Sequence, residues 1–152
     1  MLKWTPRDLK TFDDAKEYID TVVVPLIPVS LQNDRNQSAS MYEFIDRLTG
    51  SIENQFKGRV MLMPPLSYLA SGEIEQKMEA VHSWRKELES FKYIYFITSD
   101  NEWKAYEQDF EGTLIWMPSI PLEHLDEGQA RSMIVDQARQ IFNLFTRKWK
   151  ES

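Results

Sequence analysis

A chain of 152 residues is long enough to form one domain, expected to span residues 1–152, without support from a disulfide or a metal. It contains no cysteine, which excludes disulfide scaffolds, iron–sulfur clusters, thiolate zinc sites and cysteine nucleophiles. Its 18 basic and 24 acidic residues give a net charge of −6, so we expect no general binding to nucleic acid.

The N-terminal ten residues lack the apolar run and small-residue cleavage site of a signal peptide, so we expect a cytoplasmic protein. The longest apolar stretches, 22–29 and 60–66, are interrupted by prolines. Both are far shorter than the ~20 residues of a membrane-spanning helix. We therefore expect no transmembrane segment.

The first elements are a short helix and a strand. Phe12, Ala15 and Ile19 follow a helical spacing, and a continuous apolar run at 21–27 predicts a strand that is covered on both faces. Pro25 falls inside this run and has no N–H to donate. Its position indicates that the strand lies at an edge of the sheet, contains a bulge or ends early.

Two helices and two strands follow. Apolar residues at spacings of three and four run from Met41 to Phe56 and from Ile74 to Phe91, and each set predicts an amphipathic helix. Ser40, with Glu43 three residues later, predicts the start of the first of these. Continuous apolar runs at 59–64 and 92–98 predict the second and third strands.

The last third of the chain predicts a short helix, a strand and a long helix. Ser99 with Glu102 marks the start of the short helix, the run at 113–118 is the fourth strand, and Asp126 with Gln129 starts a helix that continues through Trp149. Gly58 and Gly112 each follow a helical stretch, so both are expected to be C-caps with positive φ.

This alternation predicts an α/β fold, namely a three-layer α/β/α sandwich with a four-stranded, mostly parallel sheet, flavodoxin-like or Rossmann-like. The expected strand order is 2-1-3-4.

Polar residues follow each predicted strand, and open parallel sheets bind ligands at these carboxyl ends. Proline near each strand end should bring Ser30, Ser67 and Ser119 to one edge. Arg35 beside a helix N-terminus would favour a small anion there, although a solvated loop is the simpler interpretation. The candidate ligand-binding residues are Ser30, Arg35, Ser67, Tyr68, Ser99, Asp100, Ser119 and His124.

No motif identifies a catalytic residue. The five glycines are too far apart for a dinucleotide fingerprint or a phosphate loop, and Ser119 and His124 lie in no nucleophile elbow. His82 and His124 are the only histidines and are not clustered. We therefore expect no cofactor and no metal, and leave open whether the protein is an enzyme.

Two stretches, WTPRD at 4–8 and YIDTVVVPLIPVSL at 18–31, resemble the YpiF-like family of small uncharacterised proteins from bacilli. The resemblance runs along the full chain. That family has no established activity, so the resemblance implies no catalytic residues. Its genes lie beside those of a menaquinol:cytochrome c reductase, which implies an accessory role for that complex.

Two functions of different classes fit these observations. The first is a non-enzymatic interaction or accessory factor with a protein partner, which an exposed aromatic patch would favour. The second is a small-anion or small-ligand binding protein, or an enzyme, with its site at the carboxyl ends of the strands. A deep pocket with a titratable group of perturbed pKa would favour the second. The oligomeric state is open in both cases.

Overall fold

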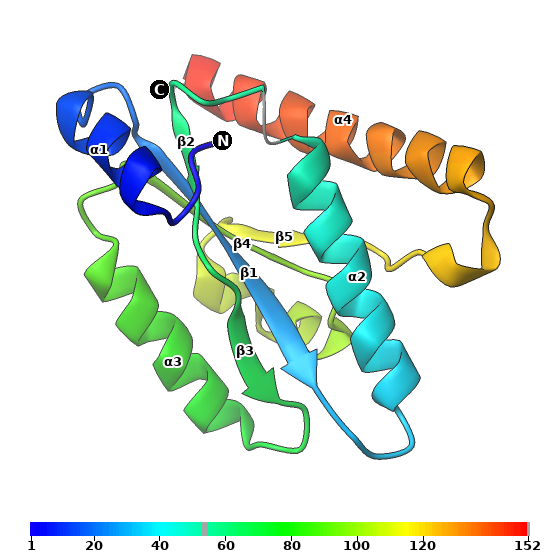
Figure 1. Cartoon of the computed structure of the whole chain (residues 1–152). Coiled ribbons are helices and arrows are strands. Elements are labelled where there is room, and N and C mark those ends of the chain that lie inside the picture. Colours follow the sequence, from blue (N-terminus) through cyan, green and yellow to red (C-terminus); the bar gives the residue numbers. More distant parts are fainter. Residues whose placement is uncertain (53–54, 152) are drawn as a thin grey trace.

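A computed structural model describes residues 1–52 and 55–151 of the chain. A parallel sheet lies between two layers of helices, so the predicted α/β sandwich is confirmed (Figure 1). The elements in chain order are α1 (Pro6–Asp14), β1 (Thr21–Val29), α2 (Arg35–Ser51), β2 (Val60–Leu62), β3 (Leu66–Leu69), α3 (Ile74–Glu87), β4 (Tyr93–Thr98), the 3₁₀ helix η1 (Asn101–Phe110), β5 (Leu114–Trp116), the 3₁₀ turn η2 (Leu122–His124) and α4 (Glu127–Glu151).

The strands lie in the order β2-β1-β4-β5, which confirms the expected order 2-1-3-4. The second predicted strand is not continuous, because β2 and β3 both pair with β1 in succession. Val23 lies opposite Leu62 and Leu26 opposite Leu66, so the neighbour of β1 has one residue more over this interval. Pro64 and Pro65 lie in this bulge, which gives a sheet of five strands instead of the predicted four.

Of the three alternatives that Pro25 indicates, an edge position for the first strand is wrong, since β1 is central in the sheet. Thr21 N–H donates to Arg59 O at 3.2 Å and Met63 N–H donates to Val23 O at 2.9 Å. The backbone N–H and C=O groups of odd-numbered residues in β1 therefore point towards β2 and β3. The nitrogen of Pro25 therefore faces the bulge, where no regular ladder bond forms. The anticipated bulge exists, but in the neighbouring strand.

The second proline of β1 also lies where no strand donor is needed. Pro28 faces the β4 side, and β4 ends at Thr98 before it reaches that position. Ser38 Oγ donates to Pro28 O at 2.6 Å, and Thr98 Oγ1 donates to Leu26 O at 3.0 Å. Side chains thus replace the ladder here, and β1 continues to Val29 without an early end.

Each face of the sheet has its own core. Val23 and Ile27 face α2 and α4, whereas Val22, Val24 and Leu26 face α1, α3 and η1. The outer edge of β2 is covered by the N-terminal segment, in which Leu2 N–H donates to Val60 O at 2.8 Å and Leu2 O accepts from Leu62 N–H at 2.7 Å. Neither β3 nor β5 has a second strand partner among the described residues.

One predicted helix start is confirmed and two are wrong. Gln129 N–H donates to Asp126 Oδ1 at 2.8 Å and Asp126 N–H donates to Gln129 Oε1 at 3.2 Å, which is the expected reciprocal cap. Ser99 does not cap η1, because Asp100 accepts from Glu102 N–H at 3.0 Å instead.

The predicted start of α2 at Ser40 is also wrong, since the helix begins at Arg35. Ser30 Oγ donates to Asp34 Oδ1, and Ser38 bonds to the end of β1, so the first turn is tied to the preceding strand. The predicted continuation of this helix towards Phe56 crosses residues 53–54, which lie outside the described residues. No helix of the described chain is both long and apolar enough to cross a membrane.

The two glycines expected at helix C-caps behave differently. Gly112 has φ +81°, as predicted, and follows Glu111, which is itself left-handed at φ 52°. The prediction for Gly58 is wrong, because its φ is not positive. Arg59 and Val60 N–H groups both bond to Phe56 O, at 3.0 and 2.8 Å, so this turn closes without a left-handed residue.

Replacing each of these two glycines by alanine should show the cost of backbone strain alone, because the added Cβ meets nothing within 4 Å at either position. Gly112→Ala should lower the free energy of unfolding by about 1–2 kcal/mol, because alanine is strained at positive φ. Gly58→Ala is the matched control, since a Cβ there meets nothing within 4 Å. It should leave stability unchanged or slightly higher. Urea unfolding measures both, and equal losses would contradict the assignment.

Candidate functional site at the carboxyl edge of the sheet

Parallel strands bring the carboxyl ends of β1, β3 and β4 to one edge of the molecule, where two cavities lie. The first, here named the apolar groove, has a volume of about 630 Å³ and is lined by Ile27, Val29, Ser30, Leu31, Arg35, Asn36, Ser38, Ala39, Tyr42, Pro65 and Ser67. The second, here named the acidic cavity, has about 260 Å³ and is lined by Pro28, Asp34, Gln37, Ser38, Met41, Ala70, Asp100, Asn101 and Glu102.

A chain of hydrogen bonds joins β3, the end of β4 and η1. Trp103 Nε1–H donates to Tyr68 OH at 2.6 Å, and the Tyr68 hydroxyl donates to Asp100 Oδ2 at 2.6 Å. The Tyr68 and Trp103 rings meet edge to face with centroids 5.5 Å apart. Burial raises the pKa of Tyr68 well above its ordinary value, and the hydrogen bond to Asp100 raises it further.

Lys77 extends this cluster from α3. Only 3% of its side chain is exposed, and its Nζ donates to Ala70 O at 3.0 Å and to Glu102 Oε1 at 3.1 Å. The same ammonium lies 5.3 Å from the centroid of the Tyr68 ring. The polar groups of the cluster are therefore hydrogen-bonded to one another, and these bonds connect β3, α3 and η1.

Ser30 and Arg35, predicted as ligand contacts, also have local partners. Ser30 Oγ bonds to Asp34 and accepts from Gln32 N–H at 3.1 Å, while Arg35 Nη1 donates to Gln32 O at 3.1 Å. These bonds shape the loop between β1 and α2. Ser30, Arg35 and Ser67 nevertheless line one cavity, as the sequence predicts.

The remaining predicted residues are dispersed. Ser99 is 4% exposed, and its Oγ has no hydrogen-bond partner among the described residues. Ser119 is half-buried after β5, and His124 is exposed with Nε2 3.5 Å from Glu123 Oε1. Ser119 and His124 line neither cavity. Pro64, expected to end a strand at this edge, lies instead in the bulge between β2 and β3.

The charges at this edge disfavour an anion in the acidic cavity. Carboxylates of Asp34, Asp100 and Glu102 line it, whereas Arg35 lies in the apolar groove. The small-anion site therefore stays a prediction that these carboxylates weigh against. No group of three His, Cys, Asp or Glu side chains in the described part of the chain is arranged to hold a metal.

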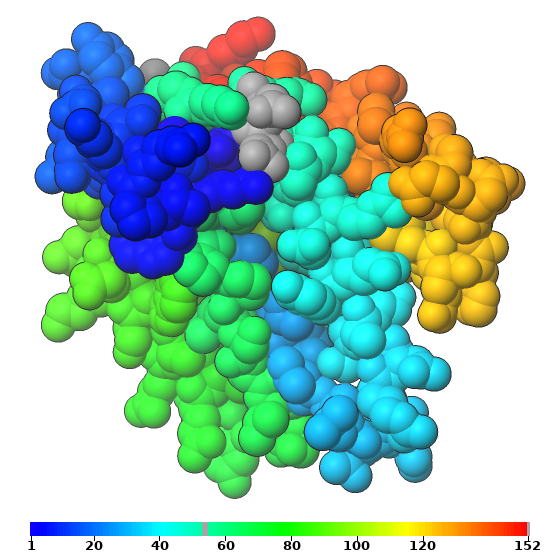
Figure 2. All heavy atoms as spheres, in the orientation of Figure 1, coloured from blue at the N-terminus to red at the C-terminus, as the bar shows by residue number. Residues whose placement is uncertain are grey.

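An exposed apolar surface at this edge was not predicted from the sequence. Leu31 is 83% exposed and Leu69 is 65% exposed, and Val29 and Tyr42 are also exposed beside them. These four residues are named the apolar patch. Figure 2 shows blue atoms of β1 between cyan α2 and the green segment that contains β3, where the apolar groove lies. Leu31 could not be foreseen because it lies in an otherwise polar loop.

These features define a small parallel α/β protein with a closed polar cluster and an open apolar groove at the carboxyl edge of its sheet. Residues 10–149 match the family described as "Protein of unknown function (DUF2487)", and the chain belongs to this family. It is 35% identical over 149 residues to the "Uncharacterized protein YpiF" of Bacillus subtilis (strain 168), covering 97% of this chain and 98% of that protein. No solved structure matches the chain.

Removing one hydroxyl should test the polar cluster. Tyr68→Phe leaves the Trp103 indole N–H and an Asp100 oxygen without their partner, so we expect a loss of about 1–3 kcal/mol in the free energy of unfolding. Tyr42→Phe removes an exposed hydroxyl and should change it by less than about 0.5 kcal/mol. Urea denaturation measures both, and equal effects would refute a structural role for the Tyr68 hydroxyl.

The raised pKa of Tyr68 also predicts how stability depends on pH. The native state keeps this proton above 10.0, the ordinary pKa of tyrosine, so the unfolded state loses it first as the pH rises. The contribution of this proton to the free energy of unfolding is fully present below this pH. Above it, the free energy of unfolding decreases by up to about 1.4 kcal/mol per pH unit for one proton. Burial raises the pKa of Tyr95 to about 12, which adds a second decline.

Above pH 10.0, the free energy of unfolding of Tyr68→Phe should therefore fall less steeply with pH than that of the wild type. The decrease due to Tyr95 should remain in both proteins up to a pH of about 12. Denaturant unfolding at a series of alkaline pH values measures the slopes. Identical slopes in the two proteins would show that Tyr68 ionises equally in both states.

Proposed function

We propose that this chain is a non-enzymatic, cytoplasmic interaction factor that binds a protein partner in the apolar groove. The observation that carries the proposal is the apolar patch, in which Leu31 and Leu69 expose most of their side chains beside a preformed cavity. Contiguous exposed apolar surface of this kind is typical of an interaction site.

The energetics support a macromolecular partner. Covering a fully exposed leucine contributes roughly 1.5–3 kcal/mol, so Leu31 and Leu69 together offer a substantial part of a micromolar affinity. Tyr42 adds an amphipathic ring at the wall of the groove, and tyrosine is enriched among residues that dominate binding energy. The polar groups that an enzyme would present are bonded to one another in the cluster around Tyr68.

The groove also indicates the chemistry of its occupant. Ala70 N–H donates to Val29 O, so even-numbered residues of β3 face β1, and the backbone of Ser67 and Leu69 faces away from the sheet. An extended segment could pair with those groups other than Leu69 O, which already accepts from Gly72 N–H at 3.0 Å, while its side chains enter the groove. Arg35 lines the groove and favours a carboxylate in that segment. The proposed ligand is therefore an extended, apolar protein segment with an acidic residue.

The menaquinol:cytochrome c reductase implied by the family resemblance is the first partner to test. Leu31→Ser with Leu69→Ser should weaken binding of the purified reductase at least about tenfold, because both apolar contacts are lost. Tyr18→Ser is the matched control, since Tyr18 is 67% exposed and belongs neither to the apolar patch nor to the groove lining. Equilibrium binding measures all three proteins, and equal affinities would overturn the proposal.

The alternative, a small-anion or small-ligand site at the same edge, has a separate test. Phosphate, sulfate and small carboxylates would raise the thermal midpoint of a protein that binds them. The interaction proposal predicts no shift at millimolar concentrations. A rise that Arg35→Gln abolishes would support the alternative instead.

A further inference from the structure

β5 is the last strand on the side of the sheet opposite β2, and its outer side has no strand partner among the described residues. Within the described part of the chain, β5 pairs only with β4, where Phe96 N–H donates to Thr113 O and Met117 N–H donates to Thr98 O, both at 2.9 Å. The backbone N–H and C=O groups of odd-numbered residues in residues 113–117 therefore point towards β4. The N–H and C=O groups of Leu114 and Trp116 point outward from the sheet, where another strand could bond to them.

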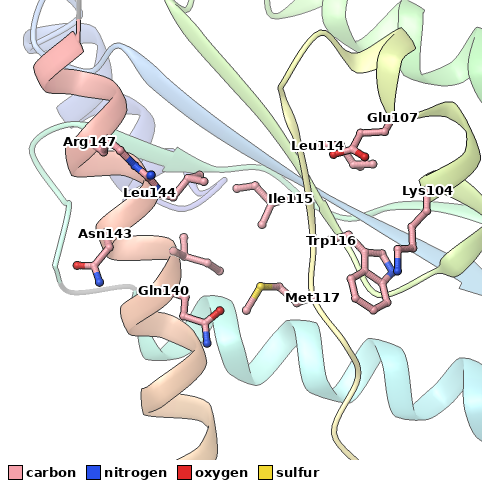
Figure 3. A pocket seen from close by; sticks show the side chains of 11 residues that line it. Lys104, Glu107, Leu114, Ile115, Trp116, Met117, Gln140, Asn143, Leu144 and Arg147 are labelled. Carbon is pink, nitrogen blue, oxygen red and sulfur yellow. The ribbon is translucent and has the colours of Figure 1, made fainter.

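This edge lies in a cleft of about 590 Å³ between η1 and α4. Figure 3 shows Lys104 and Glu107 on the η1 side of β5, and Gln140 and Arg147 on the α4 side. Lys104 and Arg147 form no ion pair with any residue that the structure describes. The cleft thus presents unpaired charges of both signs beside unpaired backbone groups.

The charges follow a definite order along the strand. Lys104 Nζ lies 3.7 Å from the centroid of the Trp116 ring, and Glu107 lies beside Leu114 (Figure 3). Figure 3 shows Lys104 and Glu107 following one another along β5, from the Trp116 end to the Leu114 end. The cation lies near one end of the strand and the carboxylate near the other.

We propose that β5 pairs with β5 of a second copy in antiparallel orientation, around a two-fold axis at Ile115. That axis places Leu114 opposite Trp116 of the second copy, and the outward N–H and C=O groups of both strands then bond to each other. It also reverses the charge row. Lys104 comes opposite Glu107 of the second copy, and Glu107 comes opposite its Lys104.

The α4 side is compatible with the same axis. Figure 3 shows Arg147 towards the Leu114 end of β5 and Gln140 towards the Met117 end. The two-fold therefore places Arg147 opposite the neutral amide of Gln140 in the second copy, and no like charges are opposed. An acidic peptide could meet Lys104 and Arg147, but its carboxylates would also face Glu107. The self-complementary order of charges favours a second copy.

Charge reversal provides the test. Lys104→Glu and Glu107→Lys should each weaken the dimer at least about tenfold, because each opposes like charges across the axis. The double variant restores opposite charges and should return to within about threefold of the wild-type dissociation constant. Sedimentation equilibrium measures the constants, and circular dichroism with thermal melting verifies the fold of each variant.

Backbone pairing needs its own variants. Leu114→Pro removes an outward N–H and should weaken the dimer at least as strongly, whereas Leu114→Ala keeps that donor and should retain it. A wild-type protein that stays monomeric at high micromolar concentration would overturn the proposal. So would a double charge variant that is no tighter than the single ones. Leu31→Ser should leave the dimer unchanged, which separates this test from that of the apolar groove.

Discussion

The missing N–H of Pro25 is the constraint on which the sheet depends. A proline in a central strand is tolerated only where no neighbour requires its donor, and the bulge at Pro64 and Pro65 provides that place. The bulge divides the neighbouring strand into β2 and β3 and shifts the pairing by one residue. It also brings Pro65 and Ser67 to the wall of the apolar groove. The interaction surface therefore follows from how the chain accommodates a proline.

The buried cluster around Tyr68 explains why this surface is well formed. Its hydrogen bonds join β3 to Asp100 and Trp103, and Lys77 ties the following loop to Glu102. A short strand beside a bulge has few ladder bonds of its own, so these side chains supply much of its attachment. The polar residues of this cluster thus hold β3, and the apolar patch stays exposed beside it.

Much of the fold follows from local pattern, because continuous apolar runs predict the strands and right-handed crossovers place helices on both faces of the sheet. The strand order 2-1-3-4 is confirmed, although no local pattern determines it. The reciprocal cap of Asp126 and Gln129 is equally local. The bulge is not, since it depends on the register between strands. Tyr68 and Trp103 are 35 residues apart, so no spacing rule reveals their contact. The sequence predicts Ser30, Arg35, Ser67 and Asp100 at one edge. It does not predict the carboxylates of Asp34 and Glu102 beside them or the exposed Leu31.

If the carboxyl edge of the sheet is a protein-binding surface, site-specific photo-crosslinking in living host cells should trap the partner there. A photoreactive residue would replace Leu31, Leu69 or, as a control on another surface, Tyr18. We expect one discrete protein adduct at positions 31 and 69, lost when Tyr42 or Val29 beside them is made polar, and none at position 18. Equal adducts at all three positions, or none at 31 and 69, would contradict it.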